Sequence, residues 1–574
     1  MNRKKLPVVF CWHMHQPEYR DPRDGVYQQP WTYLHAIKDY VDMAAHLERY
    51  PKARAVVNFV PILLEQLDDY AHQIGSYVKG GSSNILRDIL LIALIDPSKI
   101  IDPLQRMNVV RSLMRANEER LIRRFEPFQD LIDLARSISS NTDNGLYLSD
   151  ALIADLAVWY HLAWMGETVR RDNPLIIRLT DKSFHFNHQD RLELLTLIGS
   201  LIGGVFSRYQ VLAEQGRIEL SMTPYAHPIM PLLLDVQAGK QVCPNEPQPN
   251  HESYPGGSER VQWHLQRGLA VFKRYFGVHP TGCWPSEGAI SEQTIHELAK
   301  AGFAWVASGD QVLSNSLAKQ NITDQVCRHR VWQFDHLSPA LFFRDDGLSD
   351  LIGFDYQKWH ADDAVTNFIS HLESVHDSCR GEDAVVSIIL DGENAWEFYP
   401  ENGFWFLDAL YKKLSEHPDI ELTTFSTVVA QTLQRKTLQH VVAGSWVYGN
   451  LATWIGSDAK NRAWDLLIAA RIAFDQAQEM AQEKDLKNSG WDAAMLDRNL
   501  QQLAICEGSD WFWWFGDYNP SDAVRDFDQL FRLQLTRLYE LIEFPVPDAL
   551  YQPLCLSSVH DSSVEAGGVM RRGQ

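Results

Sequence analysis

Seven short β-rich runs recur along the 574-residue chain with helical stretches between them, and this alternation is the feature that most constrains the fold. The runs carry the β-branched and aromatic residues that are typical of strands. Strands that alternate with helices are typical of parallel sheets, so the pattern predicts a parallel α/β barrel. The runs are Val8–Trp12, Ala55–Val60, Ile218–Met222, Thr281–Trp284, Ala304–Ala307, Leu341–Arg344 and Val385–Leu390.

Polar residues follow several of these runs, at the point where each predicted strand ends. They are His13 with His15, His227, Glu287, Asp345 and Asp391. Chemistry in α/β barrels takes place at the C-terminal ends of the strands. The placement of these side chains is therefore a weak signal of an active site.

Helical stretches interrupt and follow the predicted barrel. A chain of 574 residues exceeds what one hydrophobic core usually supports, so we expect more than one domain. We assign residues 1–435 to a catalytic barrel with a helical insertion at about 63–216, and residues 436–556 to a C-terminal helical domain that completes the site. The tail, 557–574, contains Ser-Ser and Gly-Gly pairs and no apolar period, so we expect it to be disordered.

Charge and composition exclude several classes of partner. A formal charge of −21 argues against nucleic acid, which is bound through many lysine and arginine contacts to phosphate. No segment approaches the roughly 20 consecutive apolar residues of a membrane helix, and no signal peptide precedes the first strand, so we expect no membrane partner and a cytoplasmic location. The seven cysteines are scattered and form no C-x-x-C motif, which predicts reduced thiols. A neutral polymer such as a glucan is compatible with these properties.

Two carboxyl groups are candidates for cleaving a glycosidic bond, a reaction that needs one protonated and one ionised carboxyl beside the anomeric carbon. Glu287 follows Trp284 and Pro285 in a rigid turn, although on its own it could equally be an ordinary loop glutamate. Asp391 ends an apolar run and is followed closely by Glu393. Two neighbouring carboxylates raise the pKa of one of them, as a general acid requires. The alternatives for Asp391 are a helix cap and an EF-hand-like calcium loop, but the glycine that such a loop needs at its sixth position is missing.

The histidines at the end of the first run allow two interpretations. Alternation along a strand puts His13 and His15 on one face, next to Gln16. Paired histidines are common metal ligands, but neutral imidazole and amide groups also bind sugar hydroxyls. We favour sugar binding because no aspartate or cysteine stands at a recognisable metal spacing. His227 has the same two alternatives and could also be a core histidine.

Five motifs, in order along about four-fifths of the chain, resemble those of glycoside hydrolase family 57. They lie at 13–17, 225–228, 284–288, 391–397 and 454–464. The resemblance implies a distorted seven-stranded (β/α) barrel, followed by a helical domain, that acts on α-glucans with retention of configuration and without a metal or other cofactor. It makes Glu287 the nucleophile and Asp391 the general acid/base. The residues expected to bind substrate are His13, His15, Gln16, His227, Trp284, Gly288, Arg344, Asp345, Glu393, Asn394, Trp396, Trp446, Trp454 and Asp510.

The motif at 391–397 resembles the amylopullulanase and α-amylase-like branch of this family. It indicates hydrolysis of α-1,4 linkages, with α-1,6 linkages as a further target, in starch, glycogen, maltodextrin or pullulan. A 4-α-glucanotransferase with the same site is the alternative, because a sugar hydroxyl can replace water in the second step. Two other classes are a metal-dependent polysaccharide deacetylase that uses His13 and His15, and a glucan-binding protein without activity.

Overall fold

A computed structural model describes most of the chain. It covers residues 4–140, 142–322, 327–334, 339–379, 383–432, 434–485, 490–516 and 518–555. The predicted disordered tail, 557–574, lies outside the described residues.

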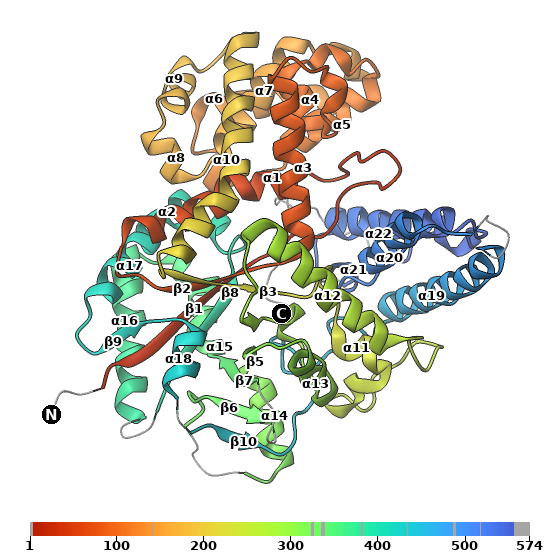
Figure 1. The fold of residues 1–574 in the computed structure, drawn as a ribbon. Helices are drawn as coiled ribbons and strands as arrows, with labels where there is room; N and C mark the ends of the chain where they lie inside the picture. Colours follow the sequence, from red (N-terminus) through yellow and green to blue (C-terminus); the bar gives the residue numbers. More distant parts are fainter. Residues whose placement is uncertain are drawn as a thin grey trace.

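Within these ranges, seven parallel strands close into a barrel (Figure 1). Neighbouring strands follow the order β1, β2, β3, β4, β5, β7, β8, and β8 pairs back with β1. Each strand coincides with one of the seven predicted runs, so the predicted fold class is confirmed. Their bounds are β1 (Leu6–Met14), β2 (Ala55–Phe59), β3 (Ile218–Met222), β4 (Gly282–Cys283), β5 (Trp305–Gly309), β7 (Ala340–Arg344) and β8 (Val386–Asp391).

Three short strands extend the sheet beyond the closed barrel. β9 (Ile420–Leu422) pairs in parallel with the start of β1. β6 (Trp332–Phe334) lies antiparallel to β7, and β10 (Lys436–Leu438) adds to β6 in parallel. They lie outside the ring of seven strands and contribute no residue to the pocket described below.

Alternation along β1 decides which of its side chains face the inside of the barrel. Val9 and Cys11 belong to the small interior cluster, whereas Phe10 between them packs outward on Phe368. His13 continues the inward-facing series two residues beyond Cys11. The strand therefore delivers this imidazole to the mouth of the barrel.

Helices surround the barrel on its outer side. Most of them connect one strand to the next, as expected for parallel strands. They are α1 (Trp31–His35), α2 (Val41–Arg49), α11 (Met230–Leu234), α12 (Gly257–Phe276), α13 (Glu292–Lys300), α14 (Asp310–Lys319), α15 (Asp346–Asp350), α16 (Ala361–Ser378), α17 (Phe404–Glu416) and α18 (Phe425–Gln431).

A helical insertion stands above the barrel in Figure 1, between β2 and β3. The long helices α3 (Pro61–Val78) and α10 (His188–Glu214) run alongside each other. By length and composition, α10 is the one helix of the described residues that could cross a membrane, but its buried side chains pack among the other helices of the insertion. The shorter helices are α4 (Ile89–Ile95), α5 (Pro103–Leu113), α6 (Glu126–Ser139), α7 (Asp150–Ala163), α8 (Glu167–Asp172) and α9 (Pro174–Lys182).

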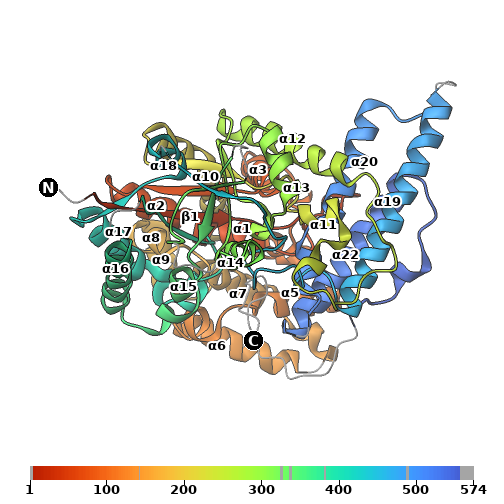
Figure 2. The same cartoon turned by 90° about the horizontal axis from the view of Figure 1, so that it is seen from below.

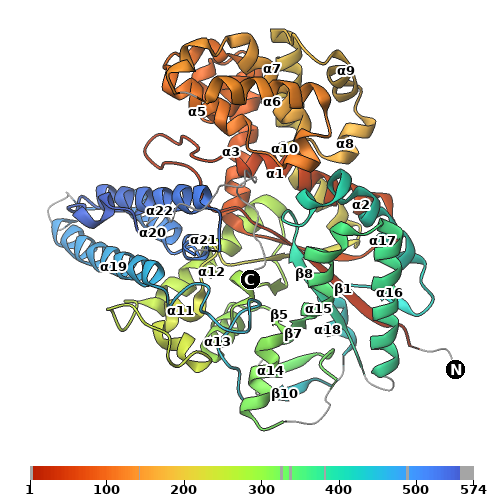
Figure 3. The same ribbon diagram turned by 180° about the vertical axis from the view of Figure 1, so that it is seen from behind.

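The C-terminal helices lie together on one side of the barrel, as Figures 2 and 3 both show. They are α19 (Asp458–Asp485), α20 (Ala493–Cys506), α21 (Asp510–Trp514) and α22 (Ser521–Leu541). All five aromatic side chains at 511–515 are buried, and Phe512 stacks on Trp464 of α19 with ring centroids 4.7 Å apart. This aromatic run therefore holds α21 against its neighbours. The division of the chain at residue 435 stays a prediction.

Candidate active site

A pocket at the C-terminal ends of the barrel strands contains both predicted catalytic carboxyl groups. Glu287 and Asp391 line it from the barrel, and Asp510 lines it from α21. Of the other predicted residues, His13, His15, Gln16, Glu393 and Asn394 also line this pocket. Side chains that are far apart in the sequence therefore meet at one place.

Glu287 lies in a tight turn after β4, with its backbone in the left-handed region at φ 57°. A residue other than glycine rarely adopts this conformation, and such strain is common at functional sites. Gly288 follows, also with positive φ, and a Cβ there would come within 2.6 Å of the Trp284 ring. The turn that holds Glu287 therefore requires glycine at position 288, next to the Trp284 ring. Trp446 fixes the glutamate through its indole N–H, which donates to Oε2 over 2.8 Å.

Asp391 is the last residue of β8 and pairs in register with His13 of β1. The next residue, Gly392, donates its N–H to the carbonyl of His13 over 2.7 Å. A Cβ on Gly392 would come within 2.2 Å of the sulfur of Met14, so a larger residue there would require the Met14 side chain to move. The Asp391 carboxylate accepts a hydrogen bond from the side-chain amide of Asn394.

The pKa of both carboxyl groups is raised. Burial, followed by repulsion from Asp391, raises the pKa of Glu287 well above its ordinary value. Burial raises the pKa of Asp391 to about 6, against the opposing effects of the Asn394 amide and of His15. At neutral pH such a pair favours states that hold a proton, and a glycosidase needs one protonated and one ionised carboxyl.

Burial and two neighbouring polar side chains decide the protonation of two histidines in the site. Burial lowers the pKa of His13 to about 3 and that of His227 well below its ordinary value, so both imidazoles are neutral near pH 7. Ser509 lies 2.7 Å from Nδ1 of His227, Nε2 of His227 lies 3.2 Å from Nε2 of His13, and Nδ1 of His13 lies 2.8 Å from Oδ1 of Asn58. Because Oδ1 of Asn58 accepts, each imidazole donates toward Asn58, and the Ser509 hydroxyl donates to His227. All four ring nitrogens are thus engaged.

His15 and Glu393 form a second connection across the pocket. Nε2 of His15 donates to Oδ1 of Asp510 over 2.8 Å, which joins β1 to α21. The backbone N–H of His15 and the amide of Gln16 donate to Oε1 of Glu393 at 3.1 and 3.3 Å. Burial and repulsion from Asp391 raise the pKa of Glu393 well above its ordinary value.

His15, His227 and Asp510 are close enough to be considered as a metal site. The rings of His15 and His227 are stacked, with centroids 3.9 Å apart and an angle of 17° between their planes. Imidazole lone pairs lie in the ring plane, so two stacked rings cannot both direct a nitrogen at an ion between them. Both nitrogens of His227 are also engaged in the hydrogen bonds described above. The arrangement fits hydrogen bonding better than metal coordination.

Two predicted binding residues, Trp284 and Arg344, do not line the pocket but contact Trp446, which holds Glu287. Trp284 is fully buried and packs edge-on against Trp446, with ring centroids 5.2 Å apart. The Arg344 guanidinium lies 5.2 Å from the centre of the Trp446 ring and bonds with Asp346 and Asp350. Neither Trp284 nor Arg344 lines the pocket.

Three further residues that were predicted to bind substrate do not line the pocket. Trp396 and Trp454 are buried in the hydrophobic core and do not line the pocket, because their rings pack among other aromatic and aliphatic side chains. Asp345 caps α15 by accepting from the N–H of Leu348 and lies 2.8 Å from Nε2 of His329. Each oxygen of its carboxylate therefore has a hydrogen-bonding partner within the protein.

The pocket also contains aromatic residues that the sequence alone did not single out as binding residues. Tyr19 follows β1, while Trp514 and Phe527 come from α21 and α22. Trp514 stacks on Phe527 with ring centroids 4.5 Å apart. Asn58 and Ser509, which orient the histidines, were not predicted either. A polar residue inside the apolar run of β2 was the available signal for Asn58.

Comparisons with known proteins agree on the family and the fold. The family model described as Glycosyl hydrolase family 57 matches residues 9–442. No curated protein matches the chain.

Solved structures with a similar fold include a branching enzyme of this family from Thermococcus kodakaraensis, solved with glucose. It has a TM-score of 0.56 at 14% identity, over 93% of this chain and 90% of that one. The α-amylase AmyC of Thermotoga maritima has a TM-score of 0.54 at 13% identity, over 94% and 93% of the two chains. The 4-α-glucanotransferase of Thermococcus litoralis has a TM-score of 0.50 at 12% identity, over 93% of this chain and 60% of that one.

Proposed function

Because this chain belongs to glycosyl hydrolase family 57, we propose that it hydrolyses α-glucans with retention of configuration, in the manner of an α-amylase or amylopullulanase. The observation that carries the proposal is the meeting of Glu287 and Asp391 in one pocket, each with a raised pKa. Retaining glycosidases use two carboxyl groups that flank the scissile bond, one protonated and one ionised.

The roles in the first step follow from the hydrogen bonds at each carboxyl. Trp446 donates to Oε2 of Glu287, which leaves Oε1 to attack the anomeric carbon. Asp391, with a pKa of about 6, gives its proton to the glycosidic oxygen as the bond breaks. The step produces a glycosyl ester on Glu287 and an ionised Asp391.

In the second step Asp391 removes a proton from water, which displaces Glu287 from the anomeric carbon. Two inversions at that carbon restore the α configuration. His13, His15 and Gln16 line the pocket where the sugar hydroxyls would lie, and Asp510 keeps His15 in place.

The pocket wall supports one alternative, transfer to a sugar acceptor by the same two carboxyl groups. Tyr19, Trp514 and Phe527 give the pocket an aromatic side. Aromatic faces stack on sugar rings and exclude water, which favours a sugar hydroxyl over water in the second step. A 4-α-glucanotransferase is therefore the second candidate.

Product analysis on maltoheptaose and pullulan separates these activities. Hydrolysis of α-1,4 linkages gives shorter maltooligosaccharides with one new reducing end per cleavage, and pullulan cleavage to maltotriose indicates α-1,6 hydrolysis. Transfer gives chains longer than the substrate without new reducing ends. The Glu287→Gln and Asp391→Asn variants serve as controls that retain the fold. Wild-type turnover in either variant would refute the proposed site.

A further inference from the structure

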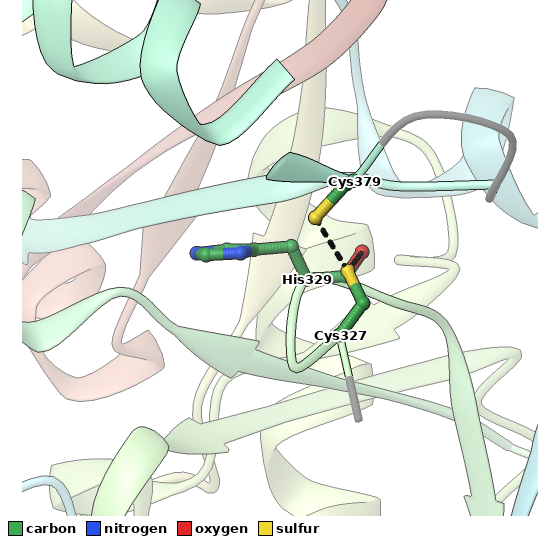
Figure 4. Close-up of side chains that lie close together, drawn as sticks. All are labelled: Cys327, His329 and Cys379. Carbon is green, nitrogen blue, oxygen red and sulfur yellow. Dashed lines mark hydrogen bonds between the residues drawn. The ribbon is translucent and has the colours of Figure 1, made fainter. Parts of the chain in front are cut away.

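A second cluster of reactive side chains lies outside the pocket, where the segment before β6 meets the end of α16. Cys327, His329 and Cys379 gather there, as Figure 4 shows. The sulfur atoms of Cys327 and Cys379 are 2.6 Å apart, although the residues are 52 positions apart in the sequence. The cysteines are in direct contact and belong to different elements.

Hydrogen bonds hold both sides of this contact in place. Arg328 donates to Asp310 and Ser314 of α14. The carbonyl of His329 accepts from the N–H of Val385, over 3.0 Å, just before β8. Cys379 ends α16, and its N–H donates to the carbonyl of Val375 over 3.0 Å. The two sulfur atoms therefore meet between ordered segments.

A bound metal fits this geometry poorly. Tetrahedral zinc with Zn–S bonds of about 2.3 Å keeps its sulfur ligands about 3.8 Å from one another. The sulfur atoms here are closer than that, and Figure 4 shows the His329 ring directed away from them. Nε2 of His329 lies 2.8 Å from the Asp345 carboxylate. The cluster thus lacks the convergent ligands of a structural metal site.

We propose that Cys327 and Cys379 form a redox-active pair that closes reversibly to an intrachain disulfide. The bond would join the segment before β6 to the end of α16. These two segments come before and after β7 in the sequence. The reaction requires an oxidant, for which a low-molecular-weight disulfide such as oxidised glutathione is sufficient.

The exposure of the two residues sets the order of the reaction. Cys327 is partly exposed, whereas Cys379 is 8% exposed, so an external disulfide reaches Cys327 first.

Each step balances as thiol–disulfide exchange. The Cys327 thiolate attacks one sulfur of oxidised glutathione, the glutathione S–S bond breaks, and one glutathione leaves as thiolate. Cys379, after losing its proton, attacks the Cys327 sulfur and releases the second glutathione. In total the protein loses two protons and two electrons, and one oxidised glutathione becomes two reduced ones.

The test uses the full-length chain, reduced completely and then equilibrated at a series of oxidised-to-reduced glutathione ratios. Free thiols are alkylated, and the digested protein is mapped by mass spectrometry. We expect one cross-linked peptide pair containing Cys327 and Cys379, lost again on reduction. The Cys327→Ser and Cys379→Ser variants should not form it. The control Cys243→Ser, at a partly exposed cysteine in another segment, should form it as the wild type does.

Thermal unfolding of the same samples provides a second measurement. The cross-link restrains the unfolded chain, so oxidation should raise the Tm of the wild type and of Cys243→Ser but not of Cys327→Ser. Glutathione attached to Cys327 without a cross-linked peptide would overturn the proposal. So would zinc bound to the reduced chain in a 1:1 ratio and lost in Cys327→Ser, because that result would make the cluster a metal site.

Discussion

The indole N–H of Trp446 donates to Oε2 of Glu287 over 2.8 Å, and the N–H of the Trp446 backbone donates to the Glu287 carbonyl over 3.1 Å. A residue 159 positions further along the chain thus orients the proposed nucleophile by two contacts. Arg344 covers the ring of the same tryptophan. The pocket is therefore supported by side chains that do not themselves line it.

Replacing Trp446 by phenylalanine tests this support. The variant keeps an aromatic ring but loses the donor to Glu287, which favours the ionised carboxylate. A hydrogen bond to a charged group contributes roughly 1.5–3 kcal/mol, so we expect kcat to fall roughly 10- to 100-fold. The measurement is turnover of maltoheptaose, with circular dichroism to check the fold. Trp359→Phe, at a tryptophan that is 46% exposed, is the matched control and should keep wild-type turnover.

The amide of Asn394 should set the alkaline limit of activity. It donates to Asp391 and opposes the effect of burial, and with both effects the pKa of Asp391 is about 6. Without this donor the carboxyl keeps its proton to higher pH. In Asn394→Ala the alkaline limb of the kcat/KM profile should therefore move upward. Asn250→Ala removes an amide that donates to Asp465 elsewhere and should leave the limb in place. A downward shift in Asn394→Ala would contradict the role of Asp391 as acid.

Glu393 should make stability dependent on pH. Its pKa in the folded state is raised above the ordinary value of 4.5. The folded chain therefore binds the proton more tightly than the unfolded chain, and this stabilisation is lost as the pH rises from 4.5 through the folded pKa. Glutamine does not titrate and can still accept at the position of Oε1. The Tm of Glu393→Gln should exceed that of the wild type at pH 8, and the difference should shrink at pH 4. A Tm difference between Glu393→Gln and the wild type that does not change with pH would refute this prediction.

Removal of metal ions should leave turnover unchanged. All four ring nitrogens of His13 and His227 have hydrogen-bonding partners, and the His227 ring stacks on that of His15. We expect dialysis against a chelator to have no effect on maltoheptaose cleavage. Elemental analysis and turnover before and after dialysis provide the measurement. Stoichiometric zinc whose loss abolishes activity would instead support a metal-dependent deacetylase.

The barrel could be predicted from the sequence because each of its strands lies in a separate β-rich run, and polar residues follow several of these runs. Val386–Asp391 illustrates this pattern. The three outer strands β6, β9 and β10 have three residues each and carry no such signal. Their strand conformation depends on pairing with segments far away in the sequence, and local pattern does not contain that information.

The two carboxyl groups of the site could also be located from the sequence, because Asp391 ends a strand and Glu287 lies in the turn that follows one. Trp514 and Phe527 could not, since they reach the pocket only when the C-terminal helices pack on the barrel. Trp396 is the opposite case, a residue that was predicted to bind substrate but does not line the pocket. Tryptophan serves both in cores and on sugar-binding surfaces, and a motif does not distinguish the two uses.

We propose that Glu287 attacks the sugar, and that Asp391 donates a proton in the first step and removes one from water in the second. A fluorinated maltosyl fluoride tests it, because the fluorine slows breakdown of the covalent intermediate while the activated leaving group allows it to form. Digestion and mass spectrometry then identify the carboxyl group that carries the sugar. We expect a maltosyl ester on Glu287 in the wild type and none in Glu287→Gln. An ester on Asp391, or no covalent adduct while the substrate is turned over, would contradict it.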